Sequence, residues 1–170
     1  MAQFHTLKIQ SIVRQTEKAV SITFDVPTAL EATFSFKAGQ YITLKTVINE
    51  TEIRRDYSLS SSPRSGDLTV TIKEIDNGIF STYANNHLNS GDSLEVGEPN
   101  GRFIFEPQSE NANSIIAFAA GSGITPIMSI ARTVLETDDK SVVLIYGNKS
   151  PEKTIFYKEI LELQSTYLNR

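Results

Sequence analysis

Arg55-Asp56-Tyr57-Ser58-Leu59-Ser60-Ser61 stands in the middle of a run that alternates apolar and polar residues, as a half-buried strand does. Side chains two positions apart on a strand share a face, so Arg55 and Tyr57 should project together. A planar cation beside a phenol suits a ligand that has both a phosphate and a flat ring. An ordinary strand with a surface salt bridge and an exposed tyrosine would give the same pattern, so both interpretations stay open for this heptad alone.

Length and composition exclude several classes of protein. A chain of 170 residues is long enough for one domain, or for one domain and part of another. Its formal net charge of −4 argues weakly against a nucleic-acid partner, which favours a basic surface. The chain has no cysteine, so these residues hold no disulfide and no cysteine-bound iron–sulfur cluster, and no histidine has a metal-spaced neighbour.

The sequence also shows no membrane-spanning segment and no secretory signal peptide. No apolar run approaches the roughly 20 residues that a membrane-spanning helix needs. The N-terminus lacks the charged and then apolar layout of a secretory signal. We therefore expect a cytoplasmic protein with no membrane partner, no nucleic-acid partner and no metal site.

The first hundred or so residues predict six short antiparallel strands and one late helix. The expected strands cover residues 4–14, 19–26, 40–47, 54–60, 68–72 and 93–96. Asn49-Glu50 marks a hairpin turn, and Ser81 or Thr82 is the expected N-cap of a helix over residues 80–88. Phe103 and Phe105 alternate as strand residues packed on a barrel would. Closing such strands into a Greek-key barrel removes their free edges, so this fold is the prediction for residues 1–106.

After a polar linker predicted at residues 107–113, the pattern changes to that of a parallel α/β domain over residues 114–170. The run 114–119 is continuously apolar, as in strands buried on both faces. A helix over 125–133, a second strand over 142–146 and a last helix from Pro151 or Thr154 complete a β-α-β-α unit. Two strands make an incomplete sheet, so we expect a further strand after Arg170 and regard the chain as a fragment of a longer protein, or as half of an assembly that a second chain completes.

Two glycine-containing segments predict phosphate contacts. Gly78-Ile79-Phe80-Ser81 enters a helix, whose first amides and dipole attract a phosphate. Gly121-Ser122-Gly123-Ile124-Thr125-Pro126 follows a buried strand and has the first two glycines of a dinucleotide loop. A capped helix after a turn, and a tight strand-to-helix turn, are the respective alternatives.

The order and spacing of the three segments resemble one family, the ferredoxin–NADP⁺ reductase superfamily. The similarity is greatest to the flavin reductase subunits of the phenylacetate-degradation type. Arg55-x-Tyr57-Ser58-x-x-Ser61 resembles the family's flavin motif, Gly78-x-x-Ser81 its pyrophosphate motif, and Gly121-x-Gly123-x-x-Pro126 its nicotinamide-nucleotide motif. Residues 36–41, 99–103 and 145–149 also match the family pattern.

The resemblance implies a barrel that holds FAD and an α/β domain for NADPH or NADH. Tyr57 and Ser58 would be catalytic, Tyr57 stacking on the isoalloxazine and Ser58 hydrogen-bonding near the flavin N5. Arg55 would bind the pyrophosphate. The implied cofactor-binding set is Arg55, Tyr57, Ser58, Ile72, Lys73, Gly78, Phe80, Ser81, Gly121, Gly123, Thr125, Pro126, Gly147 and Asn148.

The implied activity is to accept hydride from NAD(P)H on FAD and to pass single electrons to an iron–sulfur centre or an oxygenase component. A [2Fe-2S] cluster would belong to a C-terminal domain that these residues do not include. Asn148-Lys149-Ser150 after the second strand could meet a 2′-phosphate, which slightly favours NADPH over NADH. The alternative functions are an FAD-binding sensor and an interaction module, neither of which would turn over NAD(P)H.

Overall fold

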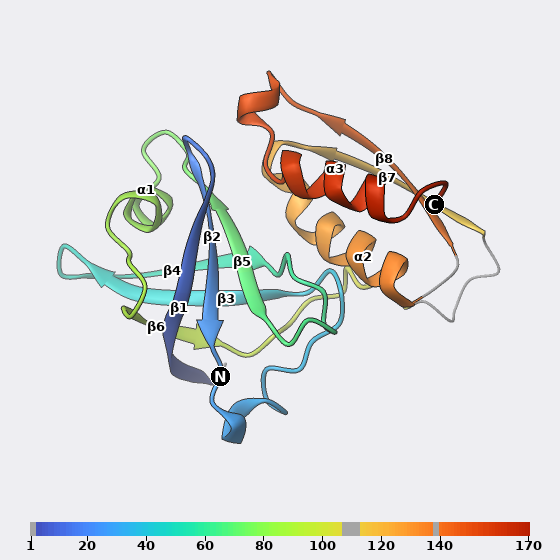
Figure 1. Cartoon of the computed structure of the whole chain (residues 1–170). Helices are drawn as coiled ribbons and strands as arrows, with labels where there is room; N and C mark the ends of the chain where they lie inside the picture. Colours follow the sequence, from blue (N-terminus) through green and yellow to red (C-terminus); the bar gives the residue numbers. More distant parts are fainter. Residues whose placement is uncertain (1–2, 107–112, 138–139) are drawn as a thin grey trace.

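The computed structural model describes residues 3–106, 113–137 and 140–170, which form two sheets and three α-helices (Figure 1). The antiparallel sheet has six strands in the order β4-β3-β6-β1-β2-β5, and the second sheet pairs β7 with β8 in parallel. These findings confirm the predicted antiparallel barrel followed by an incomplete parallel α/β unit. The polar linker predicted at residues 107–113 lies, except for Asn113, outside the described residues.

The elements follow one another closely along the chain. The strands are β1 Phe4–Thr16, β2 Ala19–Asp25, β3 Tyr41–Ile48, β4 Thr51–Ser58, β5 Leu68–Lys73, β6 Ser93–Gly97, β7 Ser114–Ala120 and β8 Ser141–Gly147. The α-helices are α1 Ile79–Asn86, α2 Ile124–Thr137 and α3 Tyr157–Thr166. Short 3₁₀ turns cover Thr28–Leu30, Gly121–Gly123 and Pro151–Lys153.

The barrel is closed by a short contact that follows β4. Leu59 forms an isolated antiparallel bridge with Val70, and the Ser60 amide donates to the carbonyl of Thr69 at 2.8 Å. At the other end of β4, Asn49 and Glu50 both adopt left-handed backbone angles, with φ of 49° and 63°. This is the two-residue hairpin geometry that matches the twist of the strands, and it confirms the predicted turn.

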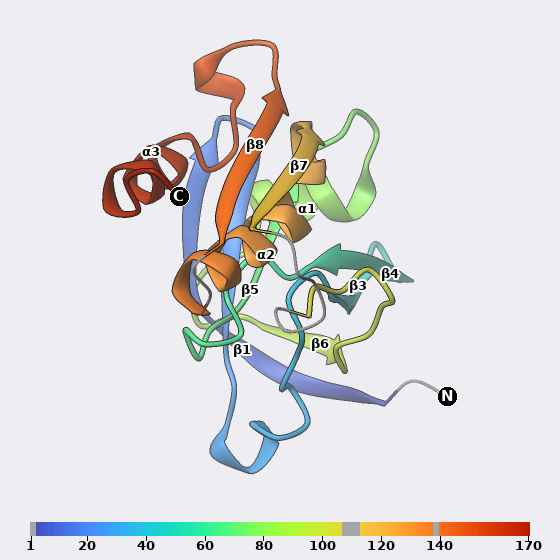
Figure 2. The same cartoon turned by 90° about the vertical axis from the view of Figure 1, so that its right-hand side faces the viewer.

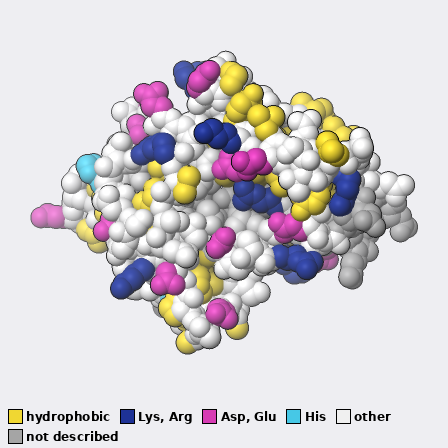
Figure 3. Space-filling view, in the orientation of Figure 1, with side chains coloured by type: hydrophobic (Ala, Val, Ile, Leu, Met, Phe, Trp, Pro, Cys, Tyr) yellow, Lys and Arg dark blue, Asp and Glu magenta, His cyan; other side chains and the backbone are white. Residues whose placement is uncertain are grey.

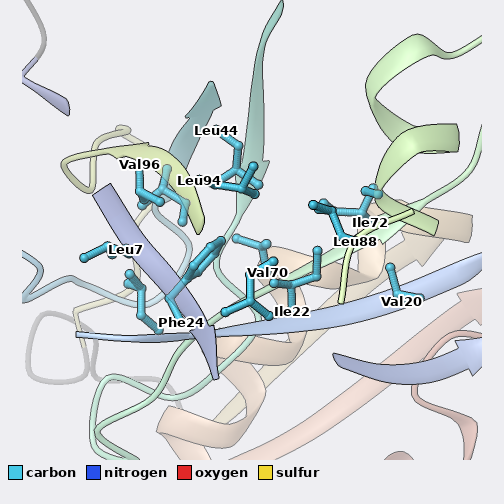
Figure 4. Close-up of a cluster of buried hydrophobic side chains, with 14 of the residues drawn as sticks. Leu7, Val20, Ile22, Phe24, Leu44, Val70, Ile72, Leu88, Leu94 and Val96 are labelled. Carbon is cyan, nitrogen blue, oxygen red and sulfur yellow. The ribbon is translucent and has the colours of Figure 1, made fainter. Parts of the chain in front are cut away.

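The barrel interior is filled by alternate side chains from its strands (Figure 4). Leu7, Ile22, Leu44, Val70 and Val96 come from five different strands, and each is at most 1% exposed. Period-two alternation therefore holds along these strands, and their inward positions are the apolar ones that the sequence predicts.

The β7–β8 sheet has helices on one face only. Ala117 and Leu144 face α2 and α3, whereas Ile116 pairs with Val143, and Phe118 with Ile145, on the opposite face. Those four side chains are 48% to 71% exposed. Hydrophobic side chains gather in the region of β7, β8 and α3 in the space-filling view (Figure 3). The continuous apolar runs were predicted to be buried on both faces, but the described residues cover only one.

Three local predictions were wrong. Phe103 and Phe105 lie outside any strand, and Phe103 is 59% exposed, because residues 101–105 run past Ala38 and Gly39 as an irregular segment. The last helix begins at Tyr157, since Phe156 takes a left-handed conformation (φ 63°) that interrupts any helix continuing from Pro151.

The third wrong prediction concerns the N-cap of α1. Gly78 is the N-cap of α1, so the helix begins about one turn earlier than an N-cap at Ser81 or Thr82 would place it. None of the helices in the described ranges has the length and apolar character needed to cross a membrane.

Replacing the same residue type inside and outside the barrel tests this packing. Ile22→Ala should lower the free energy of unfolding by about 2–5 kcal/mol, because Ile22 is 0% exposed and the change leaves a cavity. Ile116→Ala should cost far less, since Ile116 is 62% exposed on the uncovered sheet face. Urea unfolding followed by circular dichroism measures both, and equal losses would contradict the assigned core.

Candidate functional site

Arg55 and Tyr57 lie on the interior face of β4. They pair across the sheet with Leu44 and Ile42, both of which are fully buried in the barrel. Arg54 occupies the opposite face, where it pairs with Glu52 at 2.8 Å. Arg55 and Tyr57 therefore share a face, as the alternation predicts, and the exposed Arg55 lies on that face between the buried Ile53 and the half-buried Tyr57.

Tyr57 is held by aromatic packing and is half-buried. Its ring centroid lies 5.6 Å from that of Phe80 on α1, with the ring planes inclined at 38°. Burial raises the pKa of Tyr57 to about 12, and the nearby positive charge of Arg55 only partly opposes the shift. Tyr57 is therefore a neutral phenol at physiological pH, with a ring orientation set by α1.

The N-terminus of α1 offers free amides beside this ring. Ile79, Phe80 and Ser81 make up its first turn, whose N–H groups have no acceptor within the helix. A Cβ on Gly78 would lie 2.3 Å from Ser81 Oγ and 2.5 Å from Ile75 Cγ1, so this position needs glycine. The Ser81 hydroxyl donates to the Gly78 carbonyl at 3.3 Å and accepts from the Ile75 amide at 3.2 Å, which fixes the turn.

Asn85, which sequence reasoning missed, attaches α1 to the barrel. Its amide nitrogen donates to the carbonyls of Ile72 (3.2 Å) and Ser81 (2.9 Å), and it is only 4% exposed. The Arg14 guanidinium donates to its side-chain oxygen and its carbonyl at 3.1 and 2.7 Å. The two backbone segments predicted to contact the cofactor, at Ile72 and at Ser81, are thereby tied together. Nothing local in the sequence marks Asn85.

The predicted residues of β5 have different surroundings. The Ile72 side chain is 0% exposed inside the barrel, so only its backbone is available to a ligand. Lys73 extends to the second sheet, where its Nζ lies 3.4 Å from the position of a Cβ on Gly121. Lys73 therefore links the barrel part of the site to the glycine loop after β7.

The glycine loop lies at the carboxyl edge of the parallel sheet. Ala120 pairs with Gly147, so β7 and β8 end side by side, the position where α/β sheets bind ligands. Gly121 takes a left-handed conformation (φ 51°), and its carbonyl accepts from the Tyr146 hydroxyl at 2.8 Å. A Cβ on Gly123 would meet nothing within 4 Å, so this backbone stands in open space.

Thr125 and Pro126 belong to the first turn of α2. The Thr125 hydroxyl donates to the Ser122 carbonyl at 3.1 Å and so stabilises the loop from inside. Proline is tolerated at Pro126 because an amide in the first turn has no helical acceptor. Burial raises the pKa of Tyr146, whose hydroxyl fixes the other side of the loop. Tyr146 lies in the segment 145–149 that matches the family pattern, but the sequence assigns it no site role.

A cleft of about 1010 Å³ lies between the two sheets at this edge. Four of the predicted residues line it: Lys73, Gly121, Gly147 and Asn148. Arg55, Tyr57 and the start of α1 form a second group on the barrel, whereas Ser58, which pairs with Tyr41, alternates to the other face of β4. The structure thus divides the predicted set into a barrel group and a cleft group, with Lys73 between the two.

The donor set fits a flavin dinucleotide. A guanidinium and three unpaired helix amides can hold a diphosphate, and a packed neutral phenol can lie against a flat ring. The glycine loop at the ends of β7 and β8 can approach a second nucleotide closely.

Comparison with known proteins identifies this arrangement. The family model described as an oxidoreductase FAD-binding domain matches residues 6–105, more than half of the chain. The chain belongs to this FAD-binding oxidoreductase family. A second model, described as an oxidoreductase NAD-binding domain, matches residues 118–170.

Individual relatives agree with the family. A component of the 1,2-phenylacetyl-CoA epoxidase from Escherichia coli K12 is 40% identical over 100% of this chain and 48% of the relative. The solved structure of a phthalate dioxygenase reductase is described as a modular structure for electron transfer from pyridine nucleotides to [2Fe-2S]. It is 31% identical to this chain with a TM-score of 0.79, and the match covers 92% of this chain and 47% of that one.

A ferredoxin–NADP⁺ reductase from Neisseria gonorrhoeae, solved with bound FAD and NADP, is 25% identical with a TM-score of 0.80. That match covers 98% of this chain and 66% of the reductase. The chain is therefore a member of the ferredoxin–NADP⁺ reductase superfamily, as the motifs predicted, and it spans about half the length of the curated relative described above.

Two glycine substitutions distinguish a packed turn from an open loop. Gly78→Ala should lower the free energy of unfolding by about 1–3 kcal/mol, because its methyl group collides with Ser81 and Ile75. Gly123→Ala has room and should change it by less than about 1 kcal/mol. Thermal unfolding of both variants without added ligand measures the difference, and the reverse order would contradict the geometry.

The titration of Tyr57 gives a second test. Because its folded-state pKa is raised, its contribution to stability is full below pH 10, the ordinary tyrosine pKa, and is lost as the pH rises toward about 12. The ultraviolet absorbance of tyrosinate, compared between the unmodified chain and Tyr57→Phe, should assign to Tyr57 a transition near pH 12. A transition near pH 10 would contradict its burial.

Proposed function

We propose that this chain is the FAD- and nucleotide-binding part of a reductase that transfers a hydride from NAD(P)H to FAD. The electrons would then pass singly to an iron–sulfur centre or an oxygenase component. One observation carries the proposal: Arg55 and Tyr57 share the interior face of β4 beside the N-terminus of α1. The names of the relatives, a phthalate dioxygenase reductase and an epoxidase component, support this class of partner.

We further propose two domains, residues 1–106 for FAD and 114–170 for the start of the NAD(P) domain, with 107–113 as a linker. The family models, which match residues 6–105 and 118–170, support this division. A [2Fe-2S] centre would belong to a part of the protein beyond these residues. A cytoplasmic location stays a prediction.

In the barrel, Arg55 and the first amides of α1 would hold the pyrophosphate, with Gly78, Phe80 and Ser81 shaping the turn. Tyr57 would lie against the isoalloxazine, and its neutral phenol adds no charge beside the ring. Ser58 would donate a hydrogen bond near N5, and the backbone of Ile72 and Lys73 would support the flavin side chain. Bound FAD supplies the redox chemistry, as it accepts two electrons as hydride and releases them one at a time.

At the cleft, Gly121 would line the nicotinamide side and Gly147 with Asn148 the ribose side. Gly123, Thr125 and Pro126, which do not line this cleft, would shape the loop beside it. We propose NADPH as the preferred donor. Lys149 and Lys153 line the same cleft and could pair with a 2′-phosphate. Glu17, Glu74, Asp76 and Glu152 line it as well, so the preference for NADPH depends on Lys149 and Lys153 outweighing these carboxylates.

Adjacent arginines provide a matched test of FAD binding. Arg55→Ala should weaken FAD binding about 10- to 100-fold, since a hydrogen bond to a charged group contributes about 1.5–3 kcal/mol. Arg54→Ala removes the same group from the opposite face and should leave the affinity unchanged. Titration of each purified apoprotein with FAD, followed by flavin fluorescence, measures the dissociation constants.

Four outcomes test the assigned face and separate the candidate functions. Equal losses in Arg54→Ala and Arg55→Ala would contradict the assigned face, and a chain that takes up no FAD would exclude both the reductase and the sensor. Anaerobic bleaching of the FAD-loaded chain by NADPH, faster than by NADH, is expected for the reductase. Bleaching by dithionite but by neither nucleotide, in the full-length protein as well as in this chain, would favour the sensor.

A further inference from the structure

The segment Ser60–Ser62 lies where the barrel closes and where the second sheet's helix packs against it. All three residues are buried, at 1%, 4% and 1% exposed. The Ser60 hydroxyl contacts the Thr71 hydroxyl at 3.0 Å, and the Ser61 hydroxyl donates to the Asp67 carbonyl at 2.7 Å. The last serine of the flavin motif therefore holds the barrel together, with its hydroxyl already engaged inside the protein.

Helix α2 contacts this segment at three consecutive residues. The Ser129 hydroxyl donates to the Ser61 carbonyl at 2.6 Å, and the Arg132 guanidinium donates to the Ser60 carbonyl at 3.2 Å. The Ser62 hydroxyl donates to the carboxylate of Glu136. Ser129, Arg132 and Glu136 follow one another at helical spacing, so a single face of α2 holds the segment.

The surroundings of Arg132 favour a stable contact. Burial lowers the pKa of its guanidinium, while the carboxylates of Glu159, Glu136 and Asp67 oppose that shift. The guanidinium also lies 5.7 Å from the centre of the Phe156 ring. Carboxylates from the barrel (Asp67) and from the second domain (Glu136 and Glu159) therefore balance the positive charge of Arg132. A partly buried charge needs such partners.

An apolar cluster joins the same two parts of the molecule. Ala19 of β2, 0% exposed, packs with Ile124 and Met128 of α2. Apolar contacts attract without fixing direction, whereas hydrogen bonds to two successive carbonyls fix both distance and orientation. The contacts to Ser60 and Ser61, together with that of Ser62 to Glu136, therefore constrain the register between α2 and the barrel.

This register connects the two groups of the candidate site. Ser60 stands two residues after Ser58, and Ser129 stands about one helical turn after Thr125. Figures 1 and 2 show α2 beside the connection that leads from β4 to β5. The path from the flavin side to the nicotinamide side thus runs through two short rigid segments and the hydrogen bonds between them.

We infer that Ser129 and Arg132 are positioning residues, which fix Tyr57 and Ser58 relative to the loop Gly121–Thr125 by holding the backbone of Ser60 and Ser61. The inference rests on the proposed function, because the alignment that it preserves is that of the flavin ring with the nicotinamide. Neither side chain lines the cleft between the sheets. They act through the backbone and not by touching the reacting atoms.

The test compares variants of α2 that lose a hydrogen bond to the barrel with a variant that loses one within the helix. Ser129→Ala removes the hydrogen bond to Ser61, and Arg132→Met removes the one to Ser60 while keeping an apolar stem. Thr133→Val is the matched control, because the Thr133 hydroxyl donates within α2, to the Ser129 carbonyl. Arg132→Lys keeps a donor and should restore part of what Arg132→Met loses.

The first readout is the distance between the two parts of the FAD-loaded chain. The sequence has no cysteine, so Lys8→Cys and Glu162→Cys, at exposed positions, accept spin labels selectively. Double electron–electron resonance between the labels at positions 8 and 162 should give one narrow distance distribution for the otherwise unmodified chain and for Thr133→Val. It should broaden in Ser129→Ala and Arg132→Met. Unchanged distributions in those two variants would overturn the inference.

The second readout is the limiting rate of FAD reduction at saturating NADPH. It should fall about tenfold or more in Ser129→Ala and Arg132→Met, with FAD affinity and KM little changed, because a misplacement near 1 Å can cost on the order of 100-fold. A broadened distribution with an unchanged limiting rate would also overturn the inference. If the full-length protein and this chain are both bleached by dithionite but by neither nucleotide, the proposed reductase function fails, while the distance distributions still decide whether these residues set the register.

Discussion

The contact that closes the barrel, between residues 59–60 and 69–70, is the constraint on which the remaining arrangement depends. Leu59 bridges Val70 and Ser60 donates to Thr69, so β4 is fixed at its end as well as along β3. Without this closure the sheet would keep two free edges, and Arg55 and Tyr57 would stand on an unsupported edge strand. With this closure, the common face of Arg55 and Tyr57 is directed toward α1. The carbonyls of Ser60 and Ser61 then accept the hydrogen bonds that α2 donates.

Much of the site is held by backbone atoms, and its side chains are fixed by contacts from other elements. The turn at Gly78 depends on the absence of a Cβ, and Asn85 holds that turn and β5 at a constant spacing. Tyr146 and Thr125 do the same for the loop at Gly121. Such preorganisation lets a cofactor bind without a large entropic cost of ordering the protein. It also holds the cofactor in a fixed position, on which the rate of electron transfer depends.

The sequence predicts features that depend on local spacing. The common face of Arg55 and Tyr57 follows from a period of two, the turn at Asn49-Glu50 from an asparagine, which tolerates positive φ, and the division into two folds from a change in apolar pattern. Asn85, Ser129 and Arg132 could not be found in this way, because their partners outside their own helices lie at least 13 positions away in the chain and no local pattern encodes such pairs. The left-handed Phe156 was equally hidden, since an aromatic residue rarely takes that conformation.

The central claim is that one ligand occupies both the interior face of β4 and the N-terminus of α1. A crystal structure of this chain with FAD tests it most directly. The account predicts the isoalloxazine against Tyr57 and the diphosphate between Arg55 and the amides of Ile79, Phe80 and Ser81, with Ser129 and Arg132 still bonded to Ser61 and Ser60. An isoalloxazine that has no contact with Tyr57, or a diphosphate bound away from α1, would contradict it.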